Sequence, residues 1–229
     1  MNPLVPETTR LEIKFVASEN QYHTLLHWLH LHSAGFIVAF PDRRVNNIYF
    51  DTHNYAAFAE NLSGASQRAK VRYRWYGTSS GPGPGSLEVK CKRNHFGWKL
   101  SYEIPKGPYK PQTNWRAIRR EILEHLPADG KMWLDANPFP VLINRYYRKY
   151  LMSSDRKVRV TLDTKQTAWD QRFSSYPNFN RRANLPSLLV VEFKFDLKDR
   201  EAASGIMQGM PLRVSRHSKY INGVRAISV

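Results

Sequence analysis

Basic side chains occur at every second position in several segments of the sequence, a spacing that places them on one side of a β-strand. Successive strand side chains point to opposite faces, so each segment would carry charges on one face and apolar groups on the other. Arginine donates forked hydrogen bonds and lysine acts as a point charge, so cations two residues apart suit successive phosphates. The clearest ladders are Lys70, Arg72 and Arg74 in KVRYRWY, and Lys90 and Lys92 in LEVKCK. These segments predict binding of a linear phosphate chain.

The same alternation recurs elsewhere, and the polar side carries more cations than acids. Ordinary solvent faces of strands hold threonine, serine and mixed charges instead. Two like charges about 6 Å apart repel by roughly 2–3 kcal/mol at an effective dielectric constant near 20, so such a surface needs water and preferably an anion. The other basic residues of these faces and of two flanking motifs are Arg10, Lys14, Lys99, Arg148, Lys157, Arg159, Lys194, Arg216 and Lys219. The opposing acids are Glu12, Glu88, Glu103, Asp163, Glu192 and Asp196.

Three of these acids, Glu12, Asp163 and Glu192, have the ligand chemistry for a divalent metal ion. Mg²⁺ and Mn²⁺ prefer oxygen ligands and combine carboxylates with phosphate oxygens. Each acid can equally form a salt bridge with a neighbouring lysine or arginine. The residue types leave both roles open at Glu192 and favour the salt bridge at the other two.

Composition restricts the class of protein and of partner. The chain of 229 residues has 41% hydrophobic residues, enough for one core, and we expect a single domain over 1–229. Its 35 Lys and Arg against 19 Asp and Glu give a net charge of +16, which predicts a polyanionic partner: nucleic acid, a phosphate chain or an acidic membrane. One cysteine, no secretory signal and no long apolar run predict a cytoplasmic protein that does not cross a bilayer. We expect any membrane association to run through a partner protein.

Periodicity predicts an antiparallel sheet flanked by helices. ENQYHTLLHWLHLHSAG and NWRAIRREILEHLP have apolar residues at helical spacing, with Gly35 ending the first and Asn114 capping the second. RLEIKF, KVRYRWY, LEVKCK, KLSYEI, KVRVTLD and VVEFKFD alternate as strands, and GTSSGPGPGS is a hairpin loop. The stretches 127–140 and 170–187 are predicted as connections. A sheet with one wet face gives the same alternation; a closed barrel with its ionic side inward would explain the excess of cations.

The order of these motifs resembles a known family. RLEIK, VRYR, LEVKCK with Lys99, YYRKY, RVTLD, VVEFK and SRHSKYINGV are similar to the motif series of the polyphosphate polymerase (VTC) domain, a branch of the triphosphate tunnel metalloenzyme (CYTH-like) superfamily. The resemblance spans nearly the whole chain. It implies an α+β fold, an antiparallel β-barrel tunnel with flanking helices, in which the γ-phosphoryl group of ATP is transferred to a growing polyphosphate chain and ADP is released, with Mn²⁺ or Mg²⁺ as cofactor.

The resemblance also implies roles for individual residues. Those expected to act on nucleotide and chain phosphates are Lys14, Arg72, Arg74, Lys90, Lys99 and Arg148. Further phosphate-binding residues are Arg10, Lys92, Arg159, Lys194, Arg216 and Lys219, and the metal ligands are Glu192, Glu12 and Asp163. Phosphoryl transfer needs alignment and charge neutralisation more than a protein nucleophile, which agrees with these roles.

Alternatives stay open on the same residues. Relatives that hydrolyse triphosphates begin with ExExK, but Arg10 stands where the first acid would be, which favours the polymerase over a tripolyphosphate or nucleoside triphosphate hydrolase. A non-catalytic binder of polyphosphate, inositol phosphates or nucleic acid is the third hypothesis, although we expect no dedicated nucleic-acid partner. The aromatic segment 169–179 could stack on adenine or pack over one end of the sheet.

Overall fold

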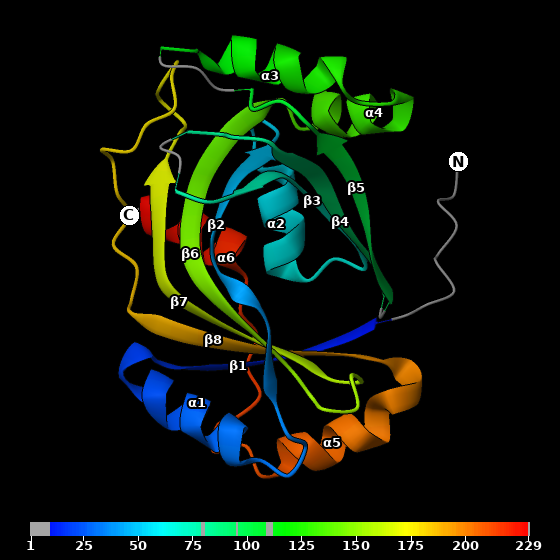
Figure 1. Cartoon of the computed structure of the whole chain (residues 1–229). Helices are drawn as coiled ribbons and strands as arrows, with labels where there is room; N and C mark the ends of the chain where they lie inside the picture. The colour runs from blue at the N-terminus through cyan, green and yellow to red at the C-terminus, as the bar shows by residue number, and fades with distance from the viewer. Residues whose placement is uncertain (1–9, 79–80, 95, 109–111, 229) are drawn as a thin grey trace. The chain divides into compact units, whose positions relative to one another are not determined.

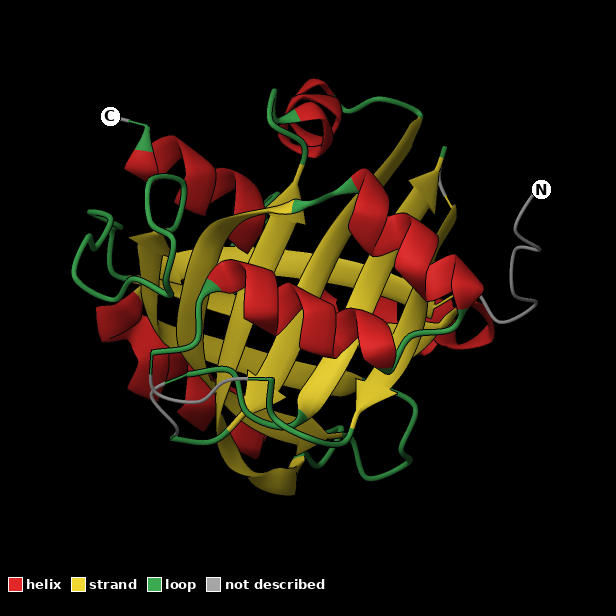
Figure 2. Cartoon of the chain, turned by 90° about the horizontal axis from the view of Figure 1, so that it is seen from above, coloured by secondary structure: helices red, strands yellow, loops and turns green. Residues whose placement is uncertain are grey.

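The computed structural model describes residues 10–78, 81–94, 96–108 and 112–228, with the side chain of Arg10 outside this description (Figure 1). Its strands are β1 (Arg10–Ser18), β2 (Ile37–Asp51), β3 (Gln67–Tyr76), β4 (Gly85–Arg93), β5 (Phe96–Ile104), β6 (Phe139–Met152), β7 (Arg159–Asp170) and β8 (Leu188–Asp196). Its α-helices are α1 (Tyr22–Leu31), α2 (Ala56–Ser63), α3 (Trp115–Glu124), α4 (Ala128–Ala136), α5 (Arg200–Gln208) and α6 (Lys219–Ile227). Figure 2 shows both classes of element, which makes the fold α+β.

The strands form one eight-stranded sheet in the order β1-β8-β7-β6-β2-β3-β4-β5. The pairs β1·β8, β7·β8, β2·β3, β3·β4 and β4·β5 are all antiparallel. The predicted α+β class and antiparallel sheet are therefore confirmed. In the strand order β1 and β5 are the end strands, so across the described residues no hydrogen-bonded ladder closes the sheet.

The chain divides into two compact units. The first unit comprises Met1–Arg43, Tyr146–Gln166 and Pro186–His217, and the second comprises Arg44–Arg145, Thr167–Leu185 and Ser218–Val229. Each unit has a hydrophobic core and a charged strand face of its own.

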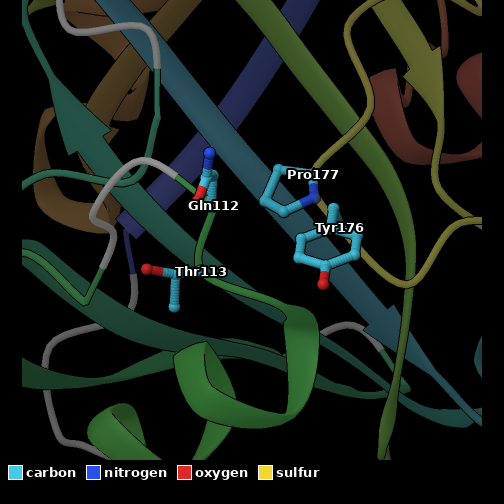
Figure 3. A pocket seen from close by; sticks show the side chains of 4 residues that line it. All are labelled: Gln112, Thr113, Tyr176 and Pro177. Atoms are coloured by element: carbon cyan, nitrogen blue, oxygen red, sulfur yellow. The ribbon is translucent and has the colours of Figure 1, made fainter.

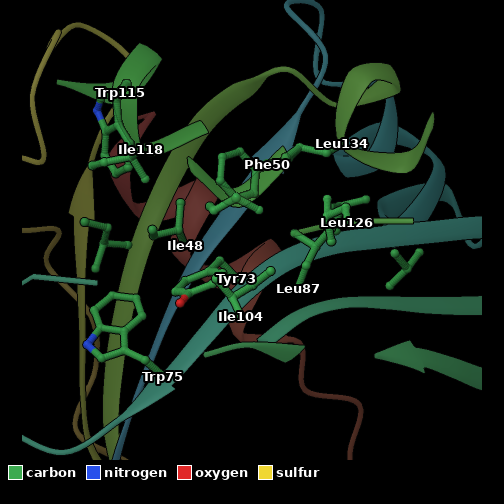
Figure 4. Close-up of a cluster of buried hydrophobic side chains, with 14 of the residues drawn as sticks. Ile48, Phe50, Tyr73, Trp75, Leu87, Ile104, Trp115, Ile118, Leu126 and Leu134 are labelled. Carbon is green, nitrogen blue, oxygen red and sulfur yellow. The ribbon is translucent and has the colours of Figure 1, made fainter. Parts of the chain in front are cut away.

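The core of the second unit lies between β3, β4 and the helices α3 and α4 (Figure 4). Tyr73 and Trp75 of β3 are fully buried there with Ile118 and Ile122 of α3. Asn114 caps α3 as predicted, since its side chain accepts a hydrogen bond from the Ala117 backbone N–H at 2.9 Å. Burial of each large apolar side chain contributes about 1.5–3 kcal/mol, which fixes the apolar side of these strands against the helices.

The core of the first unit is built in the same way from β1, β7, β8 and α1. Phe15 and Phe193 contact edge to face, with ring centroids 5.7 Å apart, and pack with Leu25 and Leu29 of α1. The helix α1 ends at Leu31 with His32 as its C-cap, so the prediction that Gly35 ends this helix is wrong. Gly35 lies in the turn after the helix, where its φ of +59° is a conformation that favours glycine.

Some elements were not predicted. The stretch 127–140 was predicted as a connection, which is wrong, because α4 begins directly after Pro127; proline suits the entrance of a helix, where no backbone N–H is needed. The strand β2 was missed because its residues from Val45 to Asp51 are all buried, so they cannot alternate between apolar and polar.

Candidate functional site

The second unit carries a row of three lysines across its sheet. Lys70 of β3 lies directly opposite Lys90 of β4, and Lys90 lies directly opposite Lys99 of β5. Directly opposed residues of an antiparallel pair have Cβ atoms about 4.5–5.5 Å apart, and like charges in such pairs are destabilising. A row of this kind favours an anion beside it.

The adjacent row contains an acid that is buried among cations. Glu88 of β4 lies opposite Arg72 of β3, and its side chain is 5% exposed. Its Oε2 accepts hydrogen bonds from Nε and Nη2 of Arg72 at 2.8 and 2.6 Å and lies 3.6 Å from Nη1 of Arg74. Its Oε1 accepts a hydrogen bond from Nζ of Lys99 at 2.9 Å. One carboxylate is thus shared by three of the predicted phosphate-binding residues.

The electrostatics of this cluster follow from its geometry. Burial alone would raise the pKa of Glu88, but Arg72, Arg74 and Lys99 outweigh burial and hold that pKa well below its usual range. Glu88 therefore stays ionised at physiological pH. Together with Lys70 and Lys90 the cluster holds more positive than negative charge.

Neutral polar groups complete this arrangement. Nε of Arg74 donates to Oδ1 of Asn47 at 2.9 Å, and Nδ2 of Asn47 donates to Oδ1 of Asn144 at 2.8 Å. Nη1 of Arg72 donates to the Tyr49 hydroxyl at 3.3 Å. Sequence analysis missed Asn47, Asn144 and Tyr49; the signal for Asn47 is a pair of asparagines inside the otherwise apolar VNNIYF.

The first unit carries a second charged face on β1 and β8. Nζ of Lys14 lies 2.7 Å from Glu12 and 3.6 Å from Glu192. Nζ of Lys194 lies 3.5 Å from Glu12 and also forms an ion pair with Glu192. Burial would lower the pKa of Lys14, but the carboxylates of Glu192 and Glu12 outweigh it and raise that pKa above its usual value. Two acids and two lysines thus form an alternating ring of charge.

Beside this ring, Arg148 of β6 binds Asp163 of β7 through a buried two-fold ion pair. Nε and Nη2 of Arg148 donate to the two oxygens of Asp163 at 2.5 and 2.7 Å. The Asp163 side chain is 0% exposed, and the guanidinium of Arg148 also lies 5.2 Å from the ring centroid of Tyr146. Burial opposes the charge on Arg148, but Asp163 outweighs it and raises the Arg148 pKa. Of the two roles considered for Asp163, the geometry fits the salt bridge.

The donor set of the ring fits a divalent metal ion in part. Glu12 and Glu192 both form ion pairs with Lys14 and Lys194, so their carboxylate oxygens are the groups that would hold a divalent cation. Within residues 10–78, 81–94, 96–108 and 112–228 no group of three or more His, Cys, Asp or Glu is placed to hold a metal. Phosphate oxygens and water would therefore have to supply the remaining ligands.

Arg159 and Arg216, which are also predicted to bind phosphate, lie in the first unit. Arg159 lies opposite Lys194, and its Nε is buried without a hydrogen-bond partner. Arg216 lies in the first unit between Ser215, whose N–H donates to the Lys14 carbonyl, and His217, whose carbonyl accepts from Lys14 Nζ.

Two more residues predicted to bind phosphate, Lys92 and Lys219, lie in the second unit. Lys92 lies at the end of β4, opposite Arg68. Lys219 begins α6 directly after Ser218, whose hydroxyl caps that helix and accepts a hydrogen bond from Lys70 Nζ at 3.1 Å. The prediction for the Arg10 side chain lies outside the described residues.

A separate pocket of about 400 Å³ is lined by Gln112, Thr113, Tyr176 and Pro177 (Figure 3). These four side chains, which are the lining that the described residues provide, carry no formal charge. Tyr176 belongs to the aromatic segment for which adenine stacking was considered, and that role stays a prediction.

Comparison with known proteins gives one family and several similar folds. The VTC domain family matches residues 9–228. The X-ray structure of a putative adenylate cyclase from Vibrio parahaemolyticus has a TM-score of 0.52 and 12% identity, covering 94% of this chain and 98% of that one, a likeness of fold alone. No curated protein matches the sequence.

Two further structures are more distant. The PH1819 protein of Pyrococcus horikoshii has a TM-score of 0.46 and 14% identity over 93% of this chain and 96% of that one. A chain of the Schizosaccharomyces pombe Mediator head module has a TM-score of 0.48 and 8% identity over 90% and 97%. Among the helices that the structure describes, none has the length and apolar character needed to span a bilayer.

Proposed function

The chain belongs to the VTC domain family, and from this premise we propose that it transfers the γ-phosphoryl group of ATP to a growing inorganic polyphosphate chain. A terminal phosphate oxygen of the chain attacks the γ-phosphorus, a new P–O bond forms, and the bond from the γ-phosphorus to the bridging oxygen breaks. ADP leaves with that oxygen. No protein nucleophile or base is needed, because the attacking phosphate is already an anion.

The observation that carries this proposal is the lysine row beside the arginine cluster in the second unit. Lys70, Lys90 and Lys99 are opposed across three strands, and Arg72 and Arg74 lie in the next rows. Such an array neutralises charge spread over several phosphates, which is the main requirement of phosphoryl transfer. We propose that these residues bind the phosphates of ATP and of the chain.

We propose further that Lys14 and Arg148 bind phosphate from the first unit and that Glu192 and Glu12 hold Mn²⁺ or Mg²⁺. The metal would neutralise phosphate charge. Support comes from the ring of Glu12, Lys14, Glu192 and Lys194, in which the acids already lie within ion-pair distance of shared cations. Arg148 is held rigidly by Asp163, which suits a group that positions a reacting phosphate.

The test is to incubate the purified protein with ATP and Mn²⁺ and to separate the products on a gel. We expect a ladder of long phosphate chains together with stoichiometric ADP. Orthophosphate without a ladder would indicate a hydrolase instead, and unchanged ATP would indicate a non-catalytic binder. Either outcome refutes the proposed transfer.

A competition experiment separates phosphate-chain binding from nucleic-acid binding. If the cation rows bind phosphate chains, tripolyphosphate should compete for the protein orders of magnitude better than duplex DNA at equal charge concentration. Competition that depends only on total charge, with a steep dependence on salt, would favour a nucleic-acid binder.

A further inference from the structure

Glu88 contacts three cations at once. Arg72 reaches one of its oxygens with two N–H groups, Arg74 lies 3.6 Å from the same oxygen, and Lys99 donates to the other. The Glu88 side chain is 5% exposed and those of Arg72 and Arg74 are 18% and 10% exposed, so these three groups are largely shielded from water, whereas the Lys99 side chain is 49% exposed. Hydrogen bonds between ionised groups at such sites are short and directional.

We infer that Glu88 is a positioning residue that gives the site its specificity for phosphate chains, an inference that rests on the proposed function. Left alone, three cations around one point would repel one another and their long side chains would spread. The carboxylate holds them at fixed separations, so their remaining donors present a fixed spacing to a ligand. Side chains ordered before binding cost less conformational entropy when a matching ligand binds, and they adapt poorly to a ligand of different spacing.

This role predicts a particular consequence of neutralising the residue. In Glu88→Gln the site gains one positive charge, which attracts every anion, but the cations lose the group that fixes their spacing. Discrimination should therefore fall even where overall anion affinity does not. A residue needed only for folding would change both affinities together, and a residue acting only through charge would do the same.

The experiment measures the dissociation constants of tripolyphosphate and citrate, a polyanion without phosphate, by isothermal titration calorimetry in metal-free buffer. We expect the wild-type protein to prefer tripolyphosphate strongly, and we expect this preference to fall at least tenfold in Glu88→Gln. Glu103→Gln is the matched control, because Glu103 is an exposed acid on the same side of the neighbouring strand β5. It removes the same charge and should keep the wild-type preference.

Two outcomes would overturn the inference: an unchanged preference in Glu88→Gln, or an equal fall in Glu88→Gln and Glu103→Gln. If Glu88→Gln does not fold, Glu88→Asp keeps the charge and withdraws the carboxylate by one methylene, so its preference should be reduced; a wild-type value would refute the positioning role. Binding is measured without turnover. A wild-type protein that prefers tripolyphosphate but makes no polyphosphate therefore refutes the proposed transfer and does not refute the role of Glu88. A wild-type protein that does not prefer tripolyphosphate overturns the inference as well.

Discussion

Replacing Asp163 by asparagine should destabilise the first unit strongly, because it removes the carboxylate that binds the buried guanidinium of Arg148. Both oxygens of Asp163 accept hydrogen bonds from Arg148, at 2.5 and 2.7 Å, and the two side chains are 0% and 10% exposed. Removing one partner of a buried ion pair costs about 3–5 kcal/mol, since the remaining charge keeps its desolvation penalty and loses its attraction. We expect the free energy of unfolding to fall by about this amount.

Urea denaturation followed by circular dichroism measures this change. Asp42→Asn is the control, because Asp42 forms a surface ion pair with Lys149, the residue after Arg148, and its side chain is 52% exposed. Exposed pairs contribute about 0–1 kcal/mol, so the control should stay near wild type. The double variant Asp163→Asn/Arg148→Met should recover much of the loss, because it removes the buried charge as well.

A loss below about 1 kcal/mol in Asp163→Asn would contradict this account of the pair, given that buried pairs cost several times more to break. A loss of Mn²⁺ affinity in Asp163→Asn without a loss of stability would contradict it as well. That pattern would mean that Asp163 serves as a metal ligand, the role that its contacts with Arg148 speak against.

Three further predictions concern the charged faces. Lys90→Gln should raise the free energy of unfolding in anion-free buffer by about 1 kcal/mol, since it removes repulsion from both opposed lysines in a partly hydrated setting. The same variant should bind tripolyphosphate more weakly. Urea denaturation and calorimetry on the same samples measure the two effects, and a loss of stability together with a loss of binding would contradict the prediction. The pKa of Glu88 is depressed in the folded state, so its stabilising contribution should be complete above the unfolded-state pKa of about 4.3 and be lost as pH falls further. The stability difference between wild type and Glu88→Gln, measured by urea denaturation, should therefore be constant from about pH 5 to pH 8 and shrink in stronger acid. A difference that changes near neutral pH would refute the ion cluster. Glu192→Gln should abolish the response of turnover to Mn²⁺ titration, and a variant that still responds would place the metal ligand elsewhere.

The strand faces and the two helices could be predicted from the sequence because one side of each packs on a core. In β3, Tyr73 and Trp75 are buried and alternate with Arg72 and Arg74, so the period of two is visible. The helix α3 shows the helical period for the same reason. Where a segment is buried on both sides, as in β2 around Asn47, no period survives, and the pair of asparagines is the one sign in that segment that polar side chains contact the site.

The partners of the charged residues could not be predicted, because they depend on strand register. Sequence alone leaves Glu88 and Glu103 as similar acids, yet the pairing of β3, β4 and β5 buries one among cations and leaves the other exposed. The ion pair between Arg148 and Asp163 likewise depends on the folding of β6 and β7 and not on a local motif. The alternation of charged residues is visible in the local sequence, whereas the counter-ion of each charged residue depends on the tertiary structure.

The opposed lysines of the second unit have a consequence for the protein in the cell. A polyanion that binds only the folded chain shifts the folding equilibrium in proportion to its concentration over its dissociation constant. Lys70, Lys90 and Lys99 lie directly opposite one another across three strands, and like charges in such pairs are destabilising. A phosphate chain that binds these lysines should therefore slow proteolysis of the protein, because it lowers the population of the unfolded chain.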